Sequence, residues 1–286
     1  MISAVPSEVL LTGEEFARTS PIVLQHGHMV TQRTNKDAVV GDDEARFINV
    51  KFLGFIPVKR VRVDLLQLDK VIVGGRLLGL HADTGDKMVT GLGTLTYINP
   101  ENNNFAALGH RMNDFETGRS VDVVGGRIYK NEVIGIDRSA GKRVGTYRSS
   151  LRSGGDPEGD IHRSNAFGLY GCLRTASNLI DGDIAALSTR WNVVPGRAKL
   201  RTTLDGEVRD FDIEIVKTRY QKKPSNKSMI VRIVDKELLQ RTGGIIHGMS
   251  GSPILQNGRV VGALTHVVLG DPSKGYGIYI DFMAPL

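Results

Sequence analysis

The chain has 286 residues and a net charge of +6 at pH 7, with 40% hydrophobic and 24% charged residues. This length supports one large domain or two modest ones, and the composition is ordinary for a soluble globular protein. The single cysteine, Cys172, excludes an intrachain disulfide. No stretch approaches the ~18 apolar residues of a membrane helix. The positive excess contains no block of five like charges, so we expect a dispersed basic surface.

The first part of the chain has the alternating pattern of short strands. Residues 47–53 and 58–65 alternate apolar and polar side chains around Pro57, and Val71-Ile72-Val73 ends at a Gly-Gly pair. Alternation at period two predicts strands, and proline and glycine predict turns between them. The polar stretch from His81 to Lys87 is the expected boundary. We therefore predict an N-terminal β-rich region over 1–87 and a second domain over 88–286.

From Met88 onward, short strand patterns alternate with turn signals. Asn257-Gly258 between apolar runs is a strong hairpin signal, because both turn residues need positive φ. Residues 236–241 read as a helical turn, and residues 141–160 as an exposed loop. Many short strands at regular spacing predict a mostly β fold, a sandwich or a barrel. The expected strands are 91–98, a hairpin over 121–129, 185–189, 198–203, 211–216 and 229–234.

A serine framed by glycines is the first candidate for chemistry. Ser250 lies in Gly248-Met249-Ser250-Gly251-Ser252-Pro253. An acyl-transfer enzyme needs an exposed hydroxyl beside backbone N–H groups that converge on the developing oxyanion. The expected donors are the N–H groups of Gly248 and Ser250. The alternative is a plain Gly/Ser turn.

His110 is the candidate general base for this serine. It follows the small-residue run Ala106-Ala107-Leu108-Gly109. An imidazole can accept the serine proton near neutral pH, although a lone histidine is more often structural. His26 and His28 alternate as a metal pair would, but no third ligand has suitable spacing. We therefore expect neither a metal nor another cofactor.

A third group would orient the imidazole and fix its tautomer. Spacing alone does not choose it, because many aspartates lie between His110 and Ser250. The candidates are Asp114, Asp122, Asp137, Asp160, Asp181, Asp183 and Asp235.

Several ordered motifs together resemble the stage IV sporulation protein B (SpoIVB) family of serine peptidases. The longest runs from Ile233 through the Gly-Met-Ser-Gly-Ser-Pro motif to Ile254. The resemblance covers about residues 88–284, and its remaining motifs are 107–110, 159–165, 211–216, 256–266 and 275–278.

This resemblance implies Ser250 as nucleophile, His110 as base and Asp235 as acid, in a chymotrypsin-like double β-barrel with an N-terminal β extension. Two departures matter. Asp235 lies only fifteen positions before Ser250, whereas that fold usually takes its acid from the first barrel, so Asp160 and Asp122 are substitutes. Asp235 is also placed to cap the helical turn that follows it. In addition, the ~20 residues between Gly74 and Thr94 cannot hold the PDZ domain that family members carry there.

The resemblance further implies a serine endopeptidase of limited specificity that signals in sporulation. Its expected substrates are itself and a protein regulator of a membrane-embedded protease, in the space between the mother-cell and forespore membranes. That extracytoplasmic location would require a removed N-terminal anchor. The alternative is a catalytically silent relative that works as a binding or scaffold module. No nucleic-acid partner is expected, because aromatic residues do not cluster among the basic ones.

Overall fold

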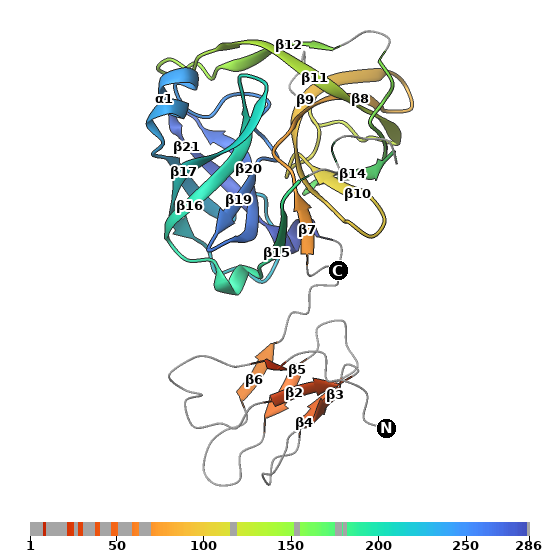
Figure 1. The fold of residues 1–286 in the computed structure, drawn as a ribbon, viewed down its shortest axis with the longest axis vertical. Coiled ribbons are helices and arrows are strands. Elements are labelled where there is room, and N and C mark those ends of the chain that lie inside the picture. The colour runs from red at the N-terminus through yellow and green to blue at the C-terminus, as the bar shows by residue number, and fades with distance from the viewer. Residues whose placement is uncertain are drawn as a thin grey trace. The chain divides into compact units, whose positions relative to one another are not determined.

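The computed structural model describes residues 70–114, 119–151, 155–174, 179 and 182–284, together with the backbone of six short strands within residues 8–62 (Figure 1). The chain divides into two compact units, Met1–Leu65 and Leu66–Leu286. The first unit contains two three-stranded antiparallel sheets, and the second contains one large sheet. The strands of the first unit are β1 (Glu8–Val9), β2 (Ile22–Gln25), β3 (His28–Val30), β4 (Ala38–Val40), β5 (Phe47–Val50) and β6 (Lys59–Arg62).

The boundary expected at residues 87/88 falls inside the second unit. Strands β8 (Leu77–Asp83) and β9 (Met88–Ile98) pair as an antiparallel hairpin from Leu77↔Thr94 to Asp83↔Met88. The polar stretch from His81 to Lys87 therefore includes a hairpin turn. Polar residues gather there because the turn is exposed, as they would in a linker between domains.

Strand pairing in the second unit closes on itself twice. In the described part of the chain, the first circuit is β9-β8-β11-β13-β14-β10, closed by the pairing of β10 with β9. The second circuit is β20-β19-β16-β17-β18-β21, closed by β20 with β21, and β7 and β15 connect the two. The expected mostly β fold is confirmed. The remaining elements are β7 (Lys70–Val73), β10 (Asn104–Ala107), β11 (Gly125–Asp137), β12 (Thr146–Leu151), β13 (Gly159–Asn165), β14 (Gly168–Leu173), β15 (Ile184–Leu187), the 3-10 helix η1 (Arg190–Asn192), β16 (Gly196–Leu204), β17 (Glu207–Thr218), β18 (Met229–Ile233), α1 (Lys236–Thr242), β19 (Pro253–Gln256), β20 (Arg259–Val268), β21 (Asp271–Tyr279) and α2 (Ile280–Met283).

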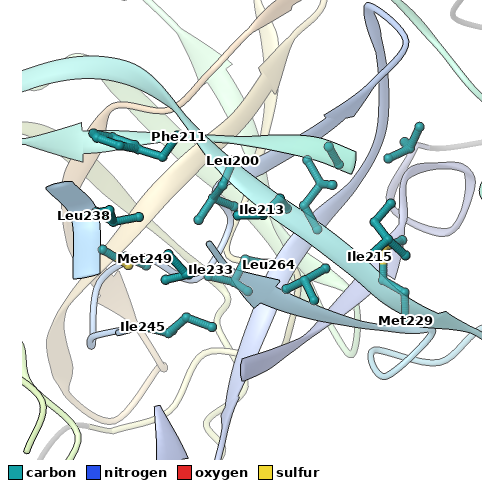
Figure 2. Packing of buried hydrophobic residues seen from close by; sticks show 14 of the residues in the cluster. Leu200, Phe211, Ile213, Ile215, Met229, Ile233, Leu238, Ile245, Met249 and Leu264 are labelled. Atoms are coloured by element: carbon teal, nitrogen blue, oxygen red, sulfur yellow. The ribbon is translucent and has the colours of Figure 1, made fainter. Parts of the chain in front are cut away.

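The apolar core of the second circuit includes the residue that precedes Ser250. Phe211, Ile213 and Ile215 alternate along β17 and are buried, as period-two patterning predicts. Met249 is 0% exposed and packs in the same cluster (Figure 2). Burying a methionine side chain contributes about 1.5–3 kcal/mol, so the serine loop is tied to the core at this point.

Local signals confirm several of the expected elements. Asn257 and Gly258 both have positive φ, 52° and 73°, in the turn between β19 and β20. Helix α1 begins after Asp235, whose side chain accepts a hydrogen bond from Leu238 N–H, and ends at Gly243 in the left-handed region. These are the N-cap and C-cap devices that start and stop helices.

Two expected elements are wrong. The hairpin expected over 121–129 does not form, since β11 is a single strand that begins at Gly125. A Cβ at Gly126 would lie 2.3 Å from the His81 carbonyl oxygen, so this glycine permits close approach of β8. The loop expected over 141–160 contains strand β12, which pairs with β11. No helix in the described part of the chain combines the length and apolar character needed to cross a membrane.

Candidate active site

Ser250 lies in the second of two successive β-turns. Met249 N–H donates to Ile246 O at 3.2 Å, and Ser252 N–H donates to Met249 O at 3.0 Å. The third position of each turn is a glycine, Gly248 with φ of 99° and Gly251 with φ of 95°. Positive φ at that position is the requirement that selects glycine in such turns. The spacing of the two glycines therefore builds a double turn that presents Ser250, which is partly exposed.

Two threonines of β9 form hydrogen bonds to the serine loop. Thr94 N–H donates to Ser250 O at 2.8 Å. The Thr94 hydroxyl donates to Gly248 O at 2.7 Å, and the Thr96 hydroxyl donates to Gly251 O at 2.8 Å. Both threonines are 0% exposed. Neither threonine is among the residues predicted from the sequence, although two threonines alternating on a largely apolar strand are a signal of buried hydrogen-bond partners.

Thr94 also joins the histidine segment to the serine loop. Leu108 N–H donates to Thr94 O at 3.3 Å, two residues before His110. A Cβ at Gly251 would lie 2.1 Å from Thr94 O and 2.5 Å from Leu108 N, so the two segments touch there. Their residues are about 140 positions apart in the sequence, and β9 brings them together.

This close contact predicts a large effect of Gly251→Ala. The added methyl group meets fixed backbone atoms, and φ of 95° is strained for alanine. We expect unfolding or a loss of stability of about 2–4 kcal/mol, judged from typical overpacking and backbone-strain costs. Thermal melting checks this result. Gly258→Ala is the matched control, because its φ is also positive but no atom lies within 4 Å of the new Cβ. Equal melting temperatures for the two variants would contradict the close contact.

The His110 imidazole is partly buried and has a defined tautomer. Its Nδ1 lies 2.6 Å from the carbonyl oxygen of Arg111. A carbonyl only accepts, so Nδ1 carries the proton and Nε2 is left as the acceptor that a general base needs. Burial lowers the pKa of His110 below its ordinary value, which keeps the ring neutral.

A second imidazole packs against the first. The rings of His110 and His266 have centroids 4.8 Å apart and an interplanar angle of 37°. Burial, then the charge of His110, then that of Lys227 lower the pKa of His266 to about 4. His266 is therefore neutral at neutral pH and places no repelling charge beside His110.

The Ser250 hydroxyl is bound to the strand that carries His266. Its Oγ donates to Thr265 O at 2.8 Å. Within the described residues, no hydrogen bond joins Ser250 to His110. Catalytic hydrogen bonds are often absent or long without substrate. Rotation of the serine side chain about its χ1 bond is the movement that would redirect this hydroxyl.

Two backbone N–H groups in the serine loop have no partner in the described part of the chain. They belong to Gly248 and Ser250, while the intervening Met249 and the following Gly251 donate to Ile246 O and Leu264 O. The free pair is the pair expected as oxyanion donors. N–H groups that have no partner in a fixed loop can donate hydrogen bonds to an oxyanion.

Asp235 lies in a different environment from the one expected of a triad acid. One carboxylate oxygen accepts from Leu238 N–H at 2.9 Å, and the other accepts from Asp212 N–H at 3.3 Å. Helix α1, which this residue caps, and strand β10, which leads to His110, lie on opposite sides of Figure 1. The segments that carry Ser250 and His110 thus meet at Thr94. The Asp235 carboxylate instead accepts hydrogen bonds from α1 and β17.

The substitute acids are also engaged elsewhere. Asp122 forms an ion pair with Arg111, and Asp160 lies 4.0 Å from Arg127 and 3.9 Å from Arg174. Among the residues that the structure describes, no group of three His, Cys, Asp or Glu side chains is placed to hold a metal ion. The side chains of His26 and His28 lie outside the described residues.

Comparisons with known proteins give a family match and similar solved structures. The model of the SpoIVB peptidase S55 family matches residues 78–284. No curated protein sequence matches the chain. Among solved structures, the active form of the Rv3671c protease from M. tuberculosis is similar, with 13% identity and a TM-score of 0.39 over 75% of this chain and 77% of that chain. Its inactive form gives 12% identity and a TM-score of 0.36 over 73% of this chain and 85% of that chain. Because the family match spans well over half of its length, the chain belongs to the SpoIVB peptidase S55 family and is a serine peptidase.

Proposed function

We propose that this serine peptidase is an endopeptidase of limited specificity, with Ser250 as nucleophile and His110 as general base. The observation that carries the proposal is the meeting of the two segments on Thr94, which binds Ser250 O and Leu108 N–H. Their shared anchor fits a reaction in which a proton passes between them.

The proposed reaction follows the acyl-enzyme route. Ser250 Oγ attacks the carbonyl carbon of the scissile peptide bond while His110 Nε2 takes the hydroxyl proton. The resulting oxyanion accepts hydrogen bonds from the N–H groups of Gly248 and Ser250. His110 then gives its proton to the leaving amine, and water releases the acyl group by the same steps in reverse order.

In this mechanism the Arg111 carbonyl oxygen orients the imidazole, as an aspartate does in a triad. It accepts from His110 Nδ1 and so holds the proton on that nitrogen, which leaves Nε2 to accept. The acid role of Asp235, which the family resemblance implies, would require its carboxylate to leave the N-terminus of α1. The capping role and the acid role make different predictions.

Two substitutions at Asp235 separate these roles. Asparagine keeps one acceptor oxygen for the cap but removes the charge and the acceptor that binds Asp212 N–H, whereas alanine removes both acceptors. We expect the folded fraction of both variants to retain turnover, with Asp235→Ala losing about 0.5–2 kcal/mol of stability and Asp235→Asn losing less. Peptidase assays and thermal melts on the same samples measure both. A loss approaching ~10⁴ in rate for both variants would restore Asp235 to a triad.

The biological role that we propose rests on the family. In this role the peptidase cleaves itself and a membrane-associated protein regulator, and so signals in sporulation. Cleavage would take place in the space between the two forespore membranes. Membership of the SpoIVB family is consistent with this role. Incubating purified protein alone and with sporulation-stage membrane proteins, followed by mapping of new N-termini, tests both substrates. Unaltered chains in both mixtures would refute this role.

The competing function is a silent binding module. The hydrogen bond from Ser250 to Thr265 O, in place of one to His110, is the observation that favours it. A fluorophosphonate probe decides between the two, because it reacts only with an activated serine. Mass spectrometry that maps the adduct to Ser250 supports the peptidase, and an unlabelled folded protein supports the binding module.

A further inference from the structure

The loop that joins β17 to β18 is strongly basic. Residues 219–228 contain four exposed cations, Arg219, Lys222, Lys223 and Lys227, and no acidic residue. In the described part of the chain none of the four forms an ion pair. Several cations on the neighbouring strands are paired, as in Lys199–Asp212 at 2.9 Å and Arg201–Asp210 at 2.6 Å. We call residues 219–228 the basic loop.

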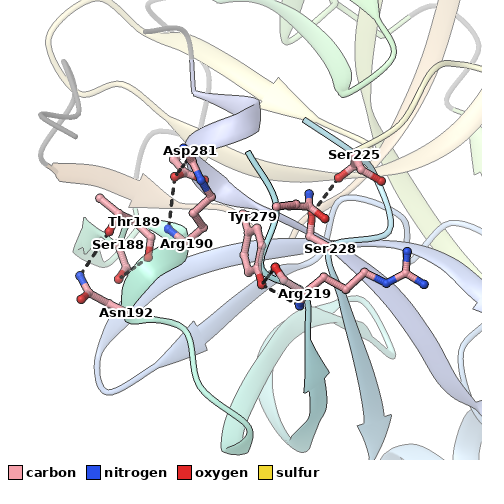
Figure 3. A network of polar contacts seen from close by, with 10 residues as sticks. Ser188, Thr189, Arg190, Asn192, Arg219, Ser225, Ser228, Tyr279 and Asp281 are labelled. Atoms are coloured by element: carbon pink, nitrogen blue, oxygen red, sulfur yellow. Dashed lines mark hydrogen bonds and ion pairs between the residues drawn. The ribbon is translucent and has the colours of Figure 1, made fainter. Parts of the chain in front are cut away.

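Hydrogen bonds hold both ends of the basic loop. Arg219 N–H donates to the Tyr279 hydroxyl at 3.2 Å, and that hydroxyl donates to Arg219 O at 2.9 Å. The Ser228 hydroxyl donates to Ser225 O at 2.7 Å (Figure 3). Ser228 N–H donates to Gly277 O at 2.8 Å. The loop therefore presents its charges from a fixed frame.

The basic loop adjoins the site through Thr265. The Thr265 hydroxyl donates to Asn226 O at 2.7 Å, and the Thr265 carbonyl accepts from Ser250 Oγ at 2.8 Å. One residue thus separates the loop from the nucleophile.

Lys227 extends this connection toward the histidines. Its Nζ lies 5.0 Å from the centroid of the Tyr276 ring, and Tyr276 is opposite His266 in the pairing of β20 with β21. After burial and His110, the charge of Lys227 contributes to the lowered pKa of His266. Charges of one sign beside a site attract a substrate of the opposite sign.

We propose that the basic loop selects peptide substrates that carry acidic side chains within a few residues of the scissile bond. This inference rests on the proposed endopeptidase function. An exposed ion pair changes binding by up to about fivefold, so several cations are needed for a strong preference. The preference is electrostatic and weakens as salt shortens the Debye length.

A peptide library prepared from a whole proteome tests the proposal. The parent enzyme, Lys227→Glu and the double variant Lys222→Glu with Lys223→Glu are incubated with it at low and high salt. New termini are identified by mass spectrometry, and rates are normalised to the enzyme that a fluorophosphonate labels. Lys130→Glu on β11 is the control, because it makes the same charge change at an exposed position outside the loop.

We expect cleavage sites of the parent to be enriched in Asp and Glu at low salt. Lys227→Glu should lower the ratio of acidic to neutral sites by about two- to fivefold, the double variant should lower it further, and the control should keep it. A parent that is neither labelled nor active refutes the proposed function itself. A labelled, active parent without acidic enrichment refutes this inference alone, as does an unchanged ratio in the loop variants. Binding of the loop to anionic vesicles or nucleic acid, with an unchanged ratio, would assign it to those partners instead.

Discussion

Ser250→Ala is expected to lower kcat/KM by roughly 10⁴-fold or more while leaving the protein folded, because removing a nucleophile leaves only the oxyanion hole and substrate binding to act. The Ser250 side chain makes one hydrogen bond, to Thr265 O, so its loss disturbs little else. Cleavage of a protein substrate and fluorophosphonate labelling both measure the effect.

Ser252→Ala is the matched control for this experiment. Ser252 is in the same double turn, but its hydroxyl is buried and donates to Thr202 Oγ1 at 2.9 Å. Losing that hydrogen bond should cost about 1 kcal/mol of stability and leave labelling intact. If Ser250→Ala were labelled at the parental rate, or if only Ser252→Ala lost labelling, Ser250 would not be the nucleophile.

His110→Ala is expected to lower kcat/KM by about 10³-fold or more, and its pH dependence identifies the reason. A base must be neutral to accept a proton. Because burial lowers the pKa of His110, the parent should keep its activity below pH ~6.5, the ordinary pKa of histidine, and lose it only at more acidic pH. The acidic limb of the pH profile should disappear in the variant.

The neighbouring histidines help to interpret that profile. His266, with a pKa of about 4, stays neutral through most of the range, so a limb well above pH 4 does not come from its titration. His162→Ala, at an exposed position of β13, is the control and should keep both rate and profile. A parental rate for His110→Ala, or a limb that persists in it, would remove His110 from the reaction.

Short-range signals in the sequence predicted the features that depend on neighbouring residues. Asn257-Gly258 predicted a hairpin, and the glycines around Ser250 predicted a turn, because positive φ is a property of one residue and its nearest atoms. The helix after Asp235 follows from a cap that spans three residues. Alternation along 211–216 predicted a strand with one buried face. The glycine-framed motif and the small-residue run made Ser250 and His110 candidates, and the family resemblance implied their roles as nucleophile and base.

The tertiary structure decided everything that depends on which strands pair and in what register. No local signal indicates that Thr94 binds both the serine loop and the histidine segment, because those contacts form only when β9 takes its place between them. The same reason explains the wrong hairpin prediction, because Gly125-Gly126 resembles a turn but the close approach of β8 places it in a strand. The acid role of Asp235 stays a prediction from the family resemblance, and the structure shows its carboxylate accepting from two backbone N–H groups. The sequence shows the charges of the basic loop. Their position beside Thr265 follows from long-range strand pairing. The free energy of such pairing is shared among residues far apart in the chain, so no local pattern reveals it.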